Sequence, residues 1–341
     1  MIDTLRIHFT ARMFRSQKEF EDVGLRLKAR ILDFGGRIVF WIGDFERLKT
    51  ENMIIGISKK RIAIYGSLWK FYKGYNSGDF WPHEVKPALD QLSRFVGMRV
   101  EKGIISEIHL AQNFEVDDYP SHYIRELQPP RKMSYNKQYP GETAWFGNKS
   151  DTQQIVVYDK TKEMIGDKDW RETEHTKNLI RYELRMKWTI SDITGFCQKR
   201  VPVALLYSTS FWLKLVAIWY VRFLSLRWTT APVYANIEGV RSWKRFCIAS
   251  YVTKAGGISA VCALIDSFAE NEEYQRKATM RNSVRNTLEE IMNDDSIVQH
   301  SSLSIELRGK VKERHNLLKE YILEKNPELL PKQAVTFVTN Y

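Results

Sequence analysis

The sequence predicts an α+β fold in two parts: an antiparallel-sheet domain over residues 1–188 and a mostly α-helical domain over residues 189–341. In several segments of the first part, apolar and polar residues alternate, which is typical of half-buried strands. After Lys187 the apolar residues recur at helical spacing almost to the end of the chain. Strands interrupted by a helix favour an α+β sheet over a helical bundle.

Strands are expected in seven segments of the first part. They are 1–9, 37–42, 61–65, 104–112, 143–146, 154–160 and 179–187. A helix is expected between the third and the fourth, where Val85, Leu89 and Leu92 recur at helical spacing after Pro82. Proline suits the first turn of a helix, so the pattern predicts a helix over residues 83–97.

The second part is expected to consist of several helices. An apolar stripe is formed by Val240, Trp243, Cys247 and Tyr251, and another helix follows the turn at 255–257. Two helices about a glycine-containing turn fit a helix-turn-helix, and they fit an ordinary αα-hairpin at least as well. A later helix carries Lys277, Arg281 and Arg285 beside its apolar stripe, and these cations face either phosphates or solvent.

Composition favours a nucleic-acid partner. The 341 residues carry a net charge of +11 with a pI near 9.4, and 43% of them are hydrophobic, which allows sizeable cores. An anionic membrane surface is the competing explanation for the basic charge. The one membrane candidate is 201–226, but Pro202, Lys214 and Arg222 interrupt it, so a buried helix is expected there.

The cysteines and the N-terminus favour a cytoplasmic location. Cys197, Cys247 and Cys262 have no spacing typical of a disulfide framework or a zinc site, which suits a reducing compartment. The first residues alternate like a strand and lack the apolar core of a signal peptide.

Two strands carry the side chains best suited to chemistry. In 154–160, Tyr158 and Lys160 share a face, and in 179–187, Glu183 lies between Arg181 and Arg185 on one face. A hydroxyl nucleophile, cations and a carboxylate in a basic protein suit attack on a phosphodiester. A packing tyrosine and a solvated charged face are the structural alternatives.

A divalent-metal site is expected near the same carboxylate. Glu107 and His109 share one face of the 104–112 strand, and with Glu183 they could bind Mg²⁺, which prefers oxygen ligands, or Mn²⁺, which tolerates nitrogen. A lone histidine in a strand is more often structural. Walker A, HExxH, zinc-type Cys/His and GxSxG motifs are absent from the sequence.

The segment 121–149 has the composition of a single-strand binding surface. It contains five basic and two acidic residues together with five aromatic ones. Basic groups neutralise phosphates and aromatic faces stack on unpaired bases, although a polar loop has similar composition. The residues expected to contact nucleic acid are Lys70, Arg131, Lys132, Tyr135, Lys149, Arg181, Arg185 and Arg281.

Four features of the chain resemble the gene II/X replication initiators of filamentous phages and related plasmids. They are Met1-Ile2-Asp3 opening a strand, the run from Gly66 to Asn76, the strand ending at 108–111, and the pairing of 156–160 with 179–185. The resemblance covers residues 1 to about 188, and more weakly 243–260. Each motif is loose, but their order and spacing together are fairly specific.

The resemblance implies a rolling-circle initiator that nicks, and can rejoin, one strand of origin DNA. Tyr158 matches the family's nucleophilic tyrosine, which becomes linked to the 5′ end and leaves a 3′-OH to prime synthesis. Lys160 matches the following lysine and would stabilise charge in the transition state. Duplex and single-stranded origin DNA are the expected partners, and a host helicase and polymerase would be further ones.

Two departures from related patterns concern the metal. Family members commonly carry an acidic residue where this chain has His109. The two-histidine motif of many other rolling-circle nucleases is absent, because no two of the seven histidines are separated by one residue. Two rival functions follow from the residues: a non-catalytic DNA-binding regulator of replication, and a peripheral membrane or assembly protein that uses the 201–226 helix.

Overall fold

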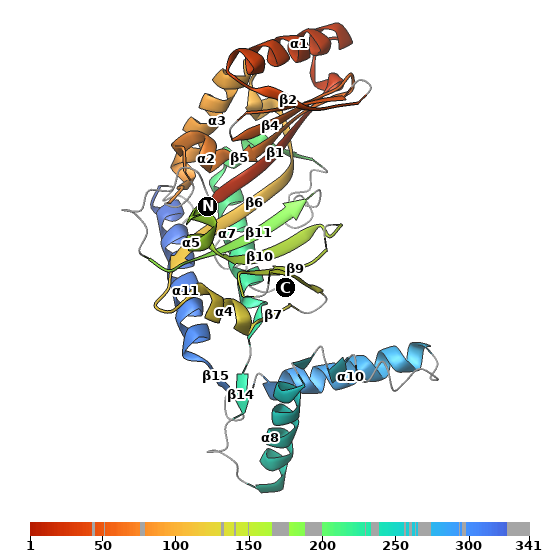
Figure 1. The fold of residues 1–341 in the computed structure, drawn as a ribbon, viewed down its shortest axis with the longest axis vertical. Helices are drawn as coiled ribbons and strands as arrows, with labels where there is room; N and C mark the ends of the chain where they lie inside the picture. The colour runs from red at the N-terminus through yellow and green to blue at the C-terminus, as the bar shows by residue number, and fades with distance from the viewer. Residues whose placement is uncertain are drawn as a thin grey trace.

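The computed structural model describes most of the chain (Figure 1). The described residues are 1–42, 45–50, 52–75, 79–130, 133–139, 141–148, 150–165, 177–187, 200–228, 230–232, 239–255, 257–258, 261–262, 264, 274–292, 294 and 298–325. For residues 40–42, 45, 135–139, 230–231 and 274–278, the backbone alone is described.

A large antiparallel sheet organises the described residues. Its strand order is β2-β3-β4-β5-β1-β6-β11-β10-β9-β8, and β12 pairs with β6. The strands are β1 Ile2–Thr10, β2 Arg37–Ile42, β3 Phe45–Lys49, β4 Met53–Ile57, β5 Arg61–Ser67, β6 Ile104–Glu115, β8 Tyr135–Tyr139, β9 Thr143–Phe146, β10 Gln153–Asp159, β11 Leu179–Lys187 and β12 Val201–Pro202. The N-terminal strand therefore lies in the middle of the sheet, beside β6, and the predicted α+β fold with an antiparallel sheet is confirmed.

The helices fall in both halves of the chain. They are α1 Gln17–Asp33, α2 Leu68–Lys73, α3 Pro82–Val96, α4 Pro120–Glu126, α5 Lys160–Ile165, α7 Thr209–Leu224, α8 Gly239–Lys254, α10 Tyr274–Met292 and α11 Ser302–Glu324. Short 3-10 turns lie at η1 Ala11–Met13, η2 Val100–Lys102 and η4 Val203–Tyr207. Two small sheets pair β7 Leu127–Gln128 with β13 Arg227–Trp228, and β14 Thr230–Pro232 with β15 Val298–His300.

All seven predicted strands form, and α3 matches the predicted helix, with differences at the ends. Lys160 is the first residue of α5 rather than the last of a strand. The strands β3 and β4 and the helix α1 were not predicted individually. In β4 the sequence Met-Ile-Ile-Gly-Ile has no alternation to reveal a strand, whereas α1 buries Phe20, Leu27 and Ile31 at helical spacing that was present in the sequence.

One face of the central strands packs on α7. The Tyr182 hydroxyl donates a 3.0 Å hydrogen bond to the carbonyl of Trp219, and the two rings lie 5.3 Å apart. Phe114 of β6 stacks on the same indole. Figure 1 views the molecule from the opposite side, with α7 passing behind the sheet. The predicted buried helix is thus confirmed, and among the described residues no helix is long and apolar enough to cross a bilayer.

The second part of the chain does not pack as one body. Side chains of α7 and α11, including Trp219 and Leu307, belong to the same hydrophobic core as the sheet. The helices α8 and α10 form separate small clusters, and Figure 1 shows them projecting from the rest beyond β14 and β15. The functional division at residue 188 stays a prediction, but the sheet core extends beyond it.

The predicted apolar stripe of α8 is not the face that the helix buries. Val240 is 71% exposed and Tyr251 55%, whereas Ala249 and Val252 are fully buried. The small side chain of Ala249 lies on the packed side of α8, whereas the rings of Trp243 and Tyr251 are exposed. The turn after α8 has Gly257 at φ +101°, but most of the helix expected next lies outside the described residues, as does the distinction between a helix-turn-helix and a hairpin.

Candidate active site

The predicted catalytic tyrosine and the predicted carboxylate lie on one face of two paired strands. In the antiparallel pair of β10 and β11, Tyr158 lies directly opposite Arg181, and Val156 lies opposite Glu183. Residues directly opposite each other point to the same side of a sheet. Because Tyr182 points the other way, onto α7, this polar face is the one turned away from α7.

His109 joins the two predicted metal-binding glutamates on this face. Its Nδ1 lies 2.7 Å from Oε1 of Glu183, and its Nε2 lies 2.8 Å from Oε1 of Glu107. All three residues are nearly inaccessible, with at most 5% exposure. The imidazole therefore contacts one carboxylate on its own strand, β6, through Nε2 and one on β11 through Nδ1.

Burial and pairing set the charges of this group. Burial opposes ionisation of Glu183, but Arg185 and the hydrogen bond from His109 outweigh it and hold the pKa of the carboxyl well below its usual range. Burial likewise disfavours the imidazolium, yet the bonds to both carboxylates raise the pKa of His109. The pKa of Glu107 is lowered, since contacts with His109 and Arg6 outweigh its burial. The arrangement is that of a cationic histidine between two carboxylates.

An arginine pairs with each of the two glutamates. Arg185 donates to both oxygens of Glu183, at 3.0 and 3.3 Å, and lies over the Trp145 ring. Arg6 pairs with Glu107 at 3.1 Å and lies over Tyr65. Alternating cations and carboxylates thus run along the face across β1, β6 and β11. We call the group Arg6, Glu107, His109, Glu183 and Arg185 the charge chain.

Arg181 is internal and is not placed to contact a phosphate in this arrangement. Its side chain has no exposed surface, pairs with Asp3 at 3.0 Å, and donates to Asn113 at 3.2 Å. The guanidinium also lies over Trp69, and Ser67 donates a 2.7 Å hydrogen bond to Asp3. Arg181 therefore supplies positive potential from within the sheet, opposite Tyr158, rather than a surface contact.

Tyr158 and Lys160 lie at the end of β10 that leads into α5. Tyr158 is partly exposed, and burial, outweighing the opposing effect of Arg181, raises the pKa of its phenol. Lys160 is 1% exposed and forms an ion pair with Glu163, one helical turn ahead. Burial and the nearby Arg181 lower the pKa of the Lys160 ammonium. Glu183, Glu163 and Asp3 add to the rise in the pKa of Tyr158, so charges of both signs surround the phenol and Arg181 is the cation that favours negative charge on it.

The predicted metal ligands come together but do not fit a metal ion as they are arranged. Both ring nitrogens of His109 are directed at carboxylates, whereas a metal needs a neutral imidazole with a free lone pair. The remaining oxygens of Glu107 and Glu183 are directed at Arg6 and Arg185. Within the described ranges, no group of three or more His, Cys, Asp or Glu side chains is placed to hold a metal.

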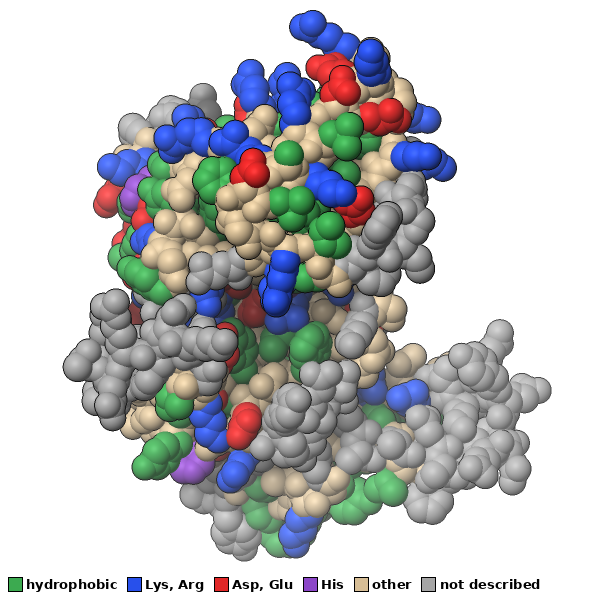
Figure 2. Space-filling model, turned by 45° about the horizontal axis from the view of Figure 1, so that its top comes forward, with side chains coloured by type: hydrophobic (Ala, Val, Ile, Leu, Met, Phe, Trp, Pro, Cys, Tyr) green, Lys and Arg blue, Asp and Glu red, His purple; other side chains and the backbone are tan. Residues whose placement is uncertain are grey.

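The predicted nucleic-acid contacts are scattered. Lys70 lies in α2, and Arg281 lies in α10, one of the two projecting helices. Tyr135 lies in β8, but its side chain is outside the described residues, as are Arg131, Lys132 and Lys149. Figure 2 shows a hollow across the middle of one face of the molecule, with acidic and basic side chains on its floor.

The sequence did not predict the contacts that several residues make in this site. These residues are Asp3, Arg6, Tyr65, Trp69, Asn113 and Trp145. The signal for Arg6 was the alternation of the first strand, which places it on the polar side between Leu5 and Ile7. The contacts of the other five residues depend on how strands far apart in the sequence pair, which no local sequence pattern reveals.

Comparison with known proteins gives a weak structural likeness. No protein-family model and no curated protein matches the chain. A solved rolling circle replication initiator protein from Geobacillus stearothermophilus is similar over 55% of this chain and 73% of its own, with 14% identity and a TM-score of 0.30. A likeness of this size carries no conclusion about function.

Proposed function

We propose that this protein initiates DNA replication by nicking one strand of origin DNA through Tyr158. The observation that carries the proposal is the register of β10 and β11, which sets Tyr158 directly opposite Arg181 and two residues from the position opposite Glu183. The resemblance of both strands to the gene II/X initiators and the net charge of +11 support the same function.

The proposed step is a transesterification. The Tyr158 oxygen forms a bond to the scissile phosphorus, and the bond from phosphorus to the 3′ oxygen breaks. The phenol proton passes to solvent, and the departing 3′ oxygen takes up a proton to become the 3′-OH that primes synthesis. The 5′ phosphate stays on Tyr158, and attack by a 3′-OH in the reverse direction rejoins the strand.

Lys160 and Arg181 would stabilise the transition state. Both residues are buried, Lys160 follows Tyr158 by two positions, and the charge of Arg181 opposes the rise in the pKa of the phenol. Fixed positive charge in a site with little water acts more strongly than the same charge in water. The pentacovalent phosphorus gains negative charge, so both cations act where charge develops.

The charge chain would position these groups rather than bind a metal. It ties β1, β6 and β11 together beside Tyr158. The requirement for Mg²⁺ or Mn²⁺ expected from the sequence stays a prediction, and no step of the proposed reaction is assigned to a metal.

A second function is a DNA-binding regulator of replication that does not cut. The complete internal pairing of Glu183 and the inaccessibility of Arg181 favour it, since neither side chain reaches solvent. In that case the protein would bind origin DNA and leave it intact.

A nicking assay on supercoiled DNA of the replicon that encodes this chain distinguishes the two functions. The wild-type protein should convert supercoiled DNA to open circles, and Tyr158→Phe should bind the DNA but cut at least a thousandfold more slowly, because Phe removes only the nucleophilic oxygen. Tyr65→Phe removes another hydroxyl from the polar face and is the matched control. Equal cutting by Tyr158→Phe and wild type would reject the proposed nucleophile.

A further inference from the structure

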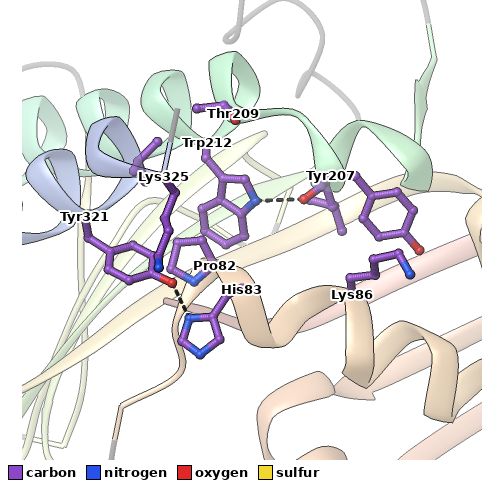
Figure 3. Close-up of a pocket in the computed structure, with 10 residues that line it drawn as sticks. Pro82, His83, Lys86, Tyr207, Thr209, Trp212, Tyr321 and Lys325 are labelled. Atoms are coloured by element: carbon purple, nitrogen blue, oxygen red, sulfur yellow. Dashed lines mark hydrogen bonds between the residues drawn. The ribbon is translucent and has the colours of Figure 1, made fainter. Parts of the chain in front are cut away.

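A cavity of about 370 Å³ lies among helices on the α7 side of the molecule, away from the polar face that carries Tyr158 (Figure 3). It is formed where the first turn of α3, the start of α7 with the preceding η4, and the end of α11 meet. Its volume is within the range of small-ligand pockets. Nothing in the proposed nicking chemistry uses it.

The lining of this cavity is cationic and aromatic. Lys86 and Lys325 lie on opposite sides of the Trp212 indole in Figure 3, and Tyr207 and Tyr321 form further walls. The lining residues include no Asp or Glu. Asp90, Glu101 and Glu84 lie near the lining, and Asp90 pairs with Lys86. The two lysines are thus the charged groups of the lining itself, and they favour an anion, whereas the rings favour a ligand that also has an apolar or aromatic part.

The lysines are available to a ligand at small cost. Lys86 pairs with Asp90 at 3.3 Å, but both side chains are more than half exposed, and such a pair stabilises the protein little. Lys325 is exposed at the end of α11. A phosphate could therefore replace the Asp90 contact of Lys86 without leaving a buried charge unpaired.

The walls, in contrast, are held in place. Trp212 is 3% exposed, and its indole N–H donates a 2.8 Å hydrogen bond to the Leu206 carbonyl. The Tyr321 hydroxyl is hydrogen-bonded to His83, as the dashed line in Figure 3 shows. Because protein contacts already hold these side chains in place, binding of a ligand would order few of them.

Two helices also begin at this cavity. Pro82 is the first residue of α3 and Thr209 is the first of α7, and both contribute to the lining. The Ser208 side chain makes no capping hydrogen bond at the start of α7. Helix N-termini carry partial positive charge. At α7, whose first turn has no acidic residue, this charge adds to that of the lysines, whereas at α3 the first-turn carboxylate of Glu84 accepts a hydrogen bond from the Trp81 N–H and offsets it.

We infer that this cavity binds a nucleotide, with the phosphate between Lys86 and Lys325 and the base against the Tyr207 ring. Tyr207 is the exposed aromatic wall, at 39%, and can receive a stacked base. The phosphate and base together form the recognised unit. They can belong to a free nucleotide or to the end of a DNA strand.

Calorimetric titration of the full chain tests the inference with dAMP, deoxyadenosine, inorganic phosphate and a short oligodeoxyadenylate. Wild type should bind dAMP or the oligonucleotide more tightly than deoxyadenosine or phosphate alone. Lys86→Glu combined with Lys325→Glu should weaken this binding at least about tenfold, because charged hydrogen bonds are removed and repulsion is added. Lys319→Glu, an exposed position on α11 outside the lining, should leave it unchanged.

A second variant tests the base. Tyr207→Ala should weaken dAMP binding and leave binding of inorganic phosphate as it is. Binding of dAMP that the double lysine variant weakens points to a free nucleotide. Binding of the oligonucleotide alone points to a strand end in this cavity only if the double lysine variant weakens it, because single-stranded DNA is also expected to bind elsewhere on the protein. Three outcomes would each overturn the inference. In the first, neither dAMP nor the oligonucleotide binds to the wild type, and in the second, the double lysine variant binds as tightly as the wild type. In the third, the wild type has the same affinity for phosphate as for dAMP. Thermal unfolding of every variant verifies that it is folded.

Discussion

The two faces of β11 are both buried, but one is apolar and the other is charged. On the side facing α7, Tyr182, Leu184 and Met186 have no exposed surface and pack in a continuous apolar core. On the other side, Arg181 and Glu183 are just as inaccessible, yet every contact described for them is polar or with an aromatic ring. Burial alone therefore does not distinguish a structural face from a chemical one.

The two faces differ in the interactions that a substitution would remove. Core packing depends on volume, so its loss is a matter of cavities and stability. The charge chain depends on each charge having a partner, so removing one member leaves another charge buried and unpaired. We expect the apolar face to govern stability alone, and the polar face to govern stability and cleavage together.

Within the charge chain, the largest effect is expected from Glu183→Gln. The amide keeps the size of the side chain but removes the charge that pairs with His109 and Arg185. Breaking a buried pair costs about 3–5 kcal/mol of stability, and cleavage should fall at least a hundredfold while DNA binding is kept or slightly tightened. Thermal unfolding and nicking are measured on one preparation.

The control for Glu183→Gln is the same substitution at an exposed glutamate. Glu115→Gln removes a carboxylate that is more than half exposed and pairs with Lys177, and it should alter neither quantity appreciably. If Glu183→Gln lowers the melting temperature while cleavage per folded molecule is unchanged, Glu183 is a structural residue alone.

The apolar face should respond through stability only. Leu184 is fully buried between Ile155 and Leu110 on the neighbouring strands. Leu184→Ala should cost about 2–5 kcal/mol of unfolding free energy because a cavity remains. Below the unfolding temperature, cleavage per folded molecule should equal that of wild type. A large loss of cleavage at full folding would show that the two faces are coupled.

A smaller effect is expected from the aromatic-basic segment 121–149. Tyr135→Ala should weaken binding of single-stranded origin DNA by about 1–3 kcal/mol if the ring stacks on a base, with little change in salt dependence. Replacing Arg131 and Lys132 by Ala should instead reduce the log-log salt slope by roughly one unit for each phosphate that the variant no longer neutralises. Unchanged affinity and slope in both variants would mean that the strand is bound elsewhere, with Arg281 on α10 the next position to test.

The smallest expected effect is a pH dependence from His109. Its pKa is raised in the folded protein, so its pairing stabilises the fold fully below the unfolded pKa of about 6.5. This contribution is lost as the pH rises from there through the raised folded value. Wild type should therefore lose stability over this range, and His109→Gln should lose less. His122→Gln, at an exposed histidine, should behave as wild type does. A wild-type curve that is flat across this range would contradict a cationic His109.

The sequence predicted the strands of the site but not the burial of their polar face. Alternation places Arg181, Glu183 and Arg185 on one side of β11 correctly, because the period of a strand is local. It cannot reveal that Asp3, far away in the chain, pairs with Arg181, since that depends on β6 lying between β1 and β11 in the sheet. For the same reason the sequence does not reveal that His109 contacts Glu183, and its role as a metal ligand stays a prediction.

The helices show a similar limit. The spacing of apolar residues predicted α8, but the exposed Val240 and the buried Ala249 show that periodicity finds a helix without fixing its packed face. In α7, where almost all side chains are apolar, burial followed from composition alone.

The most direct test of the central claim is to find DNA covalently attached to Tyr158. Protein is incubated with its supercoiled replicon DNA, denatured in detergent and digested with nuclease and protease, and the peptides are analysed by mass spectrometry. The account predicts a nucleotide adduct on the peptide that contains Tyr158, absent from Tyr158→Phe and present in Tyr182→Phe, whose missing hydroxyl faces α7. An adduct on another residue, or nicked DNA without any adduct, would contradict it.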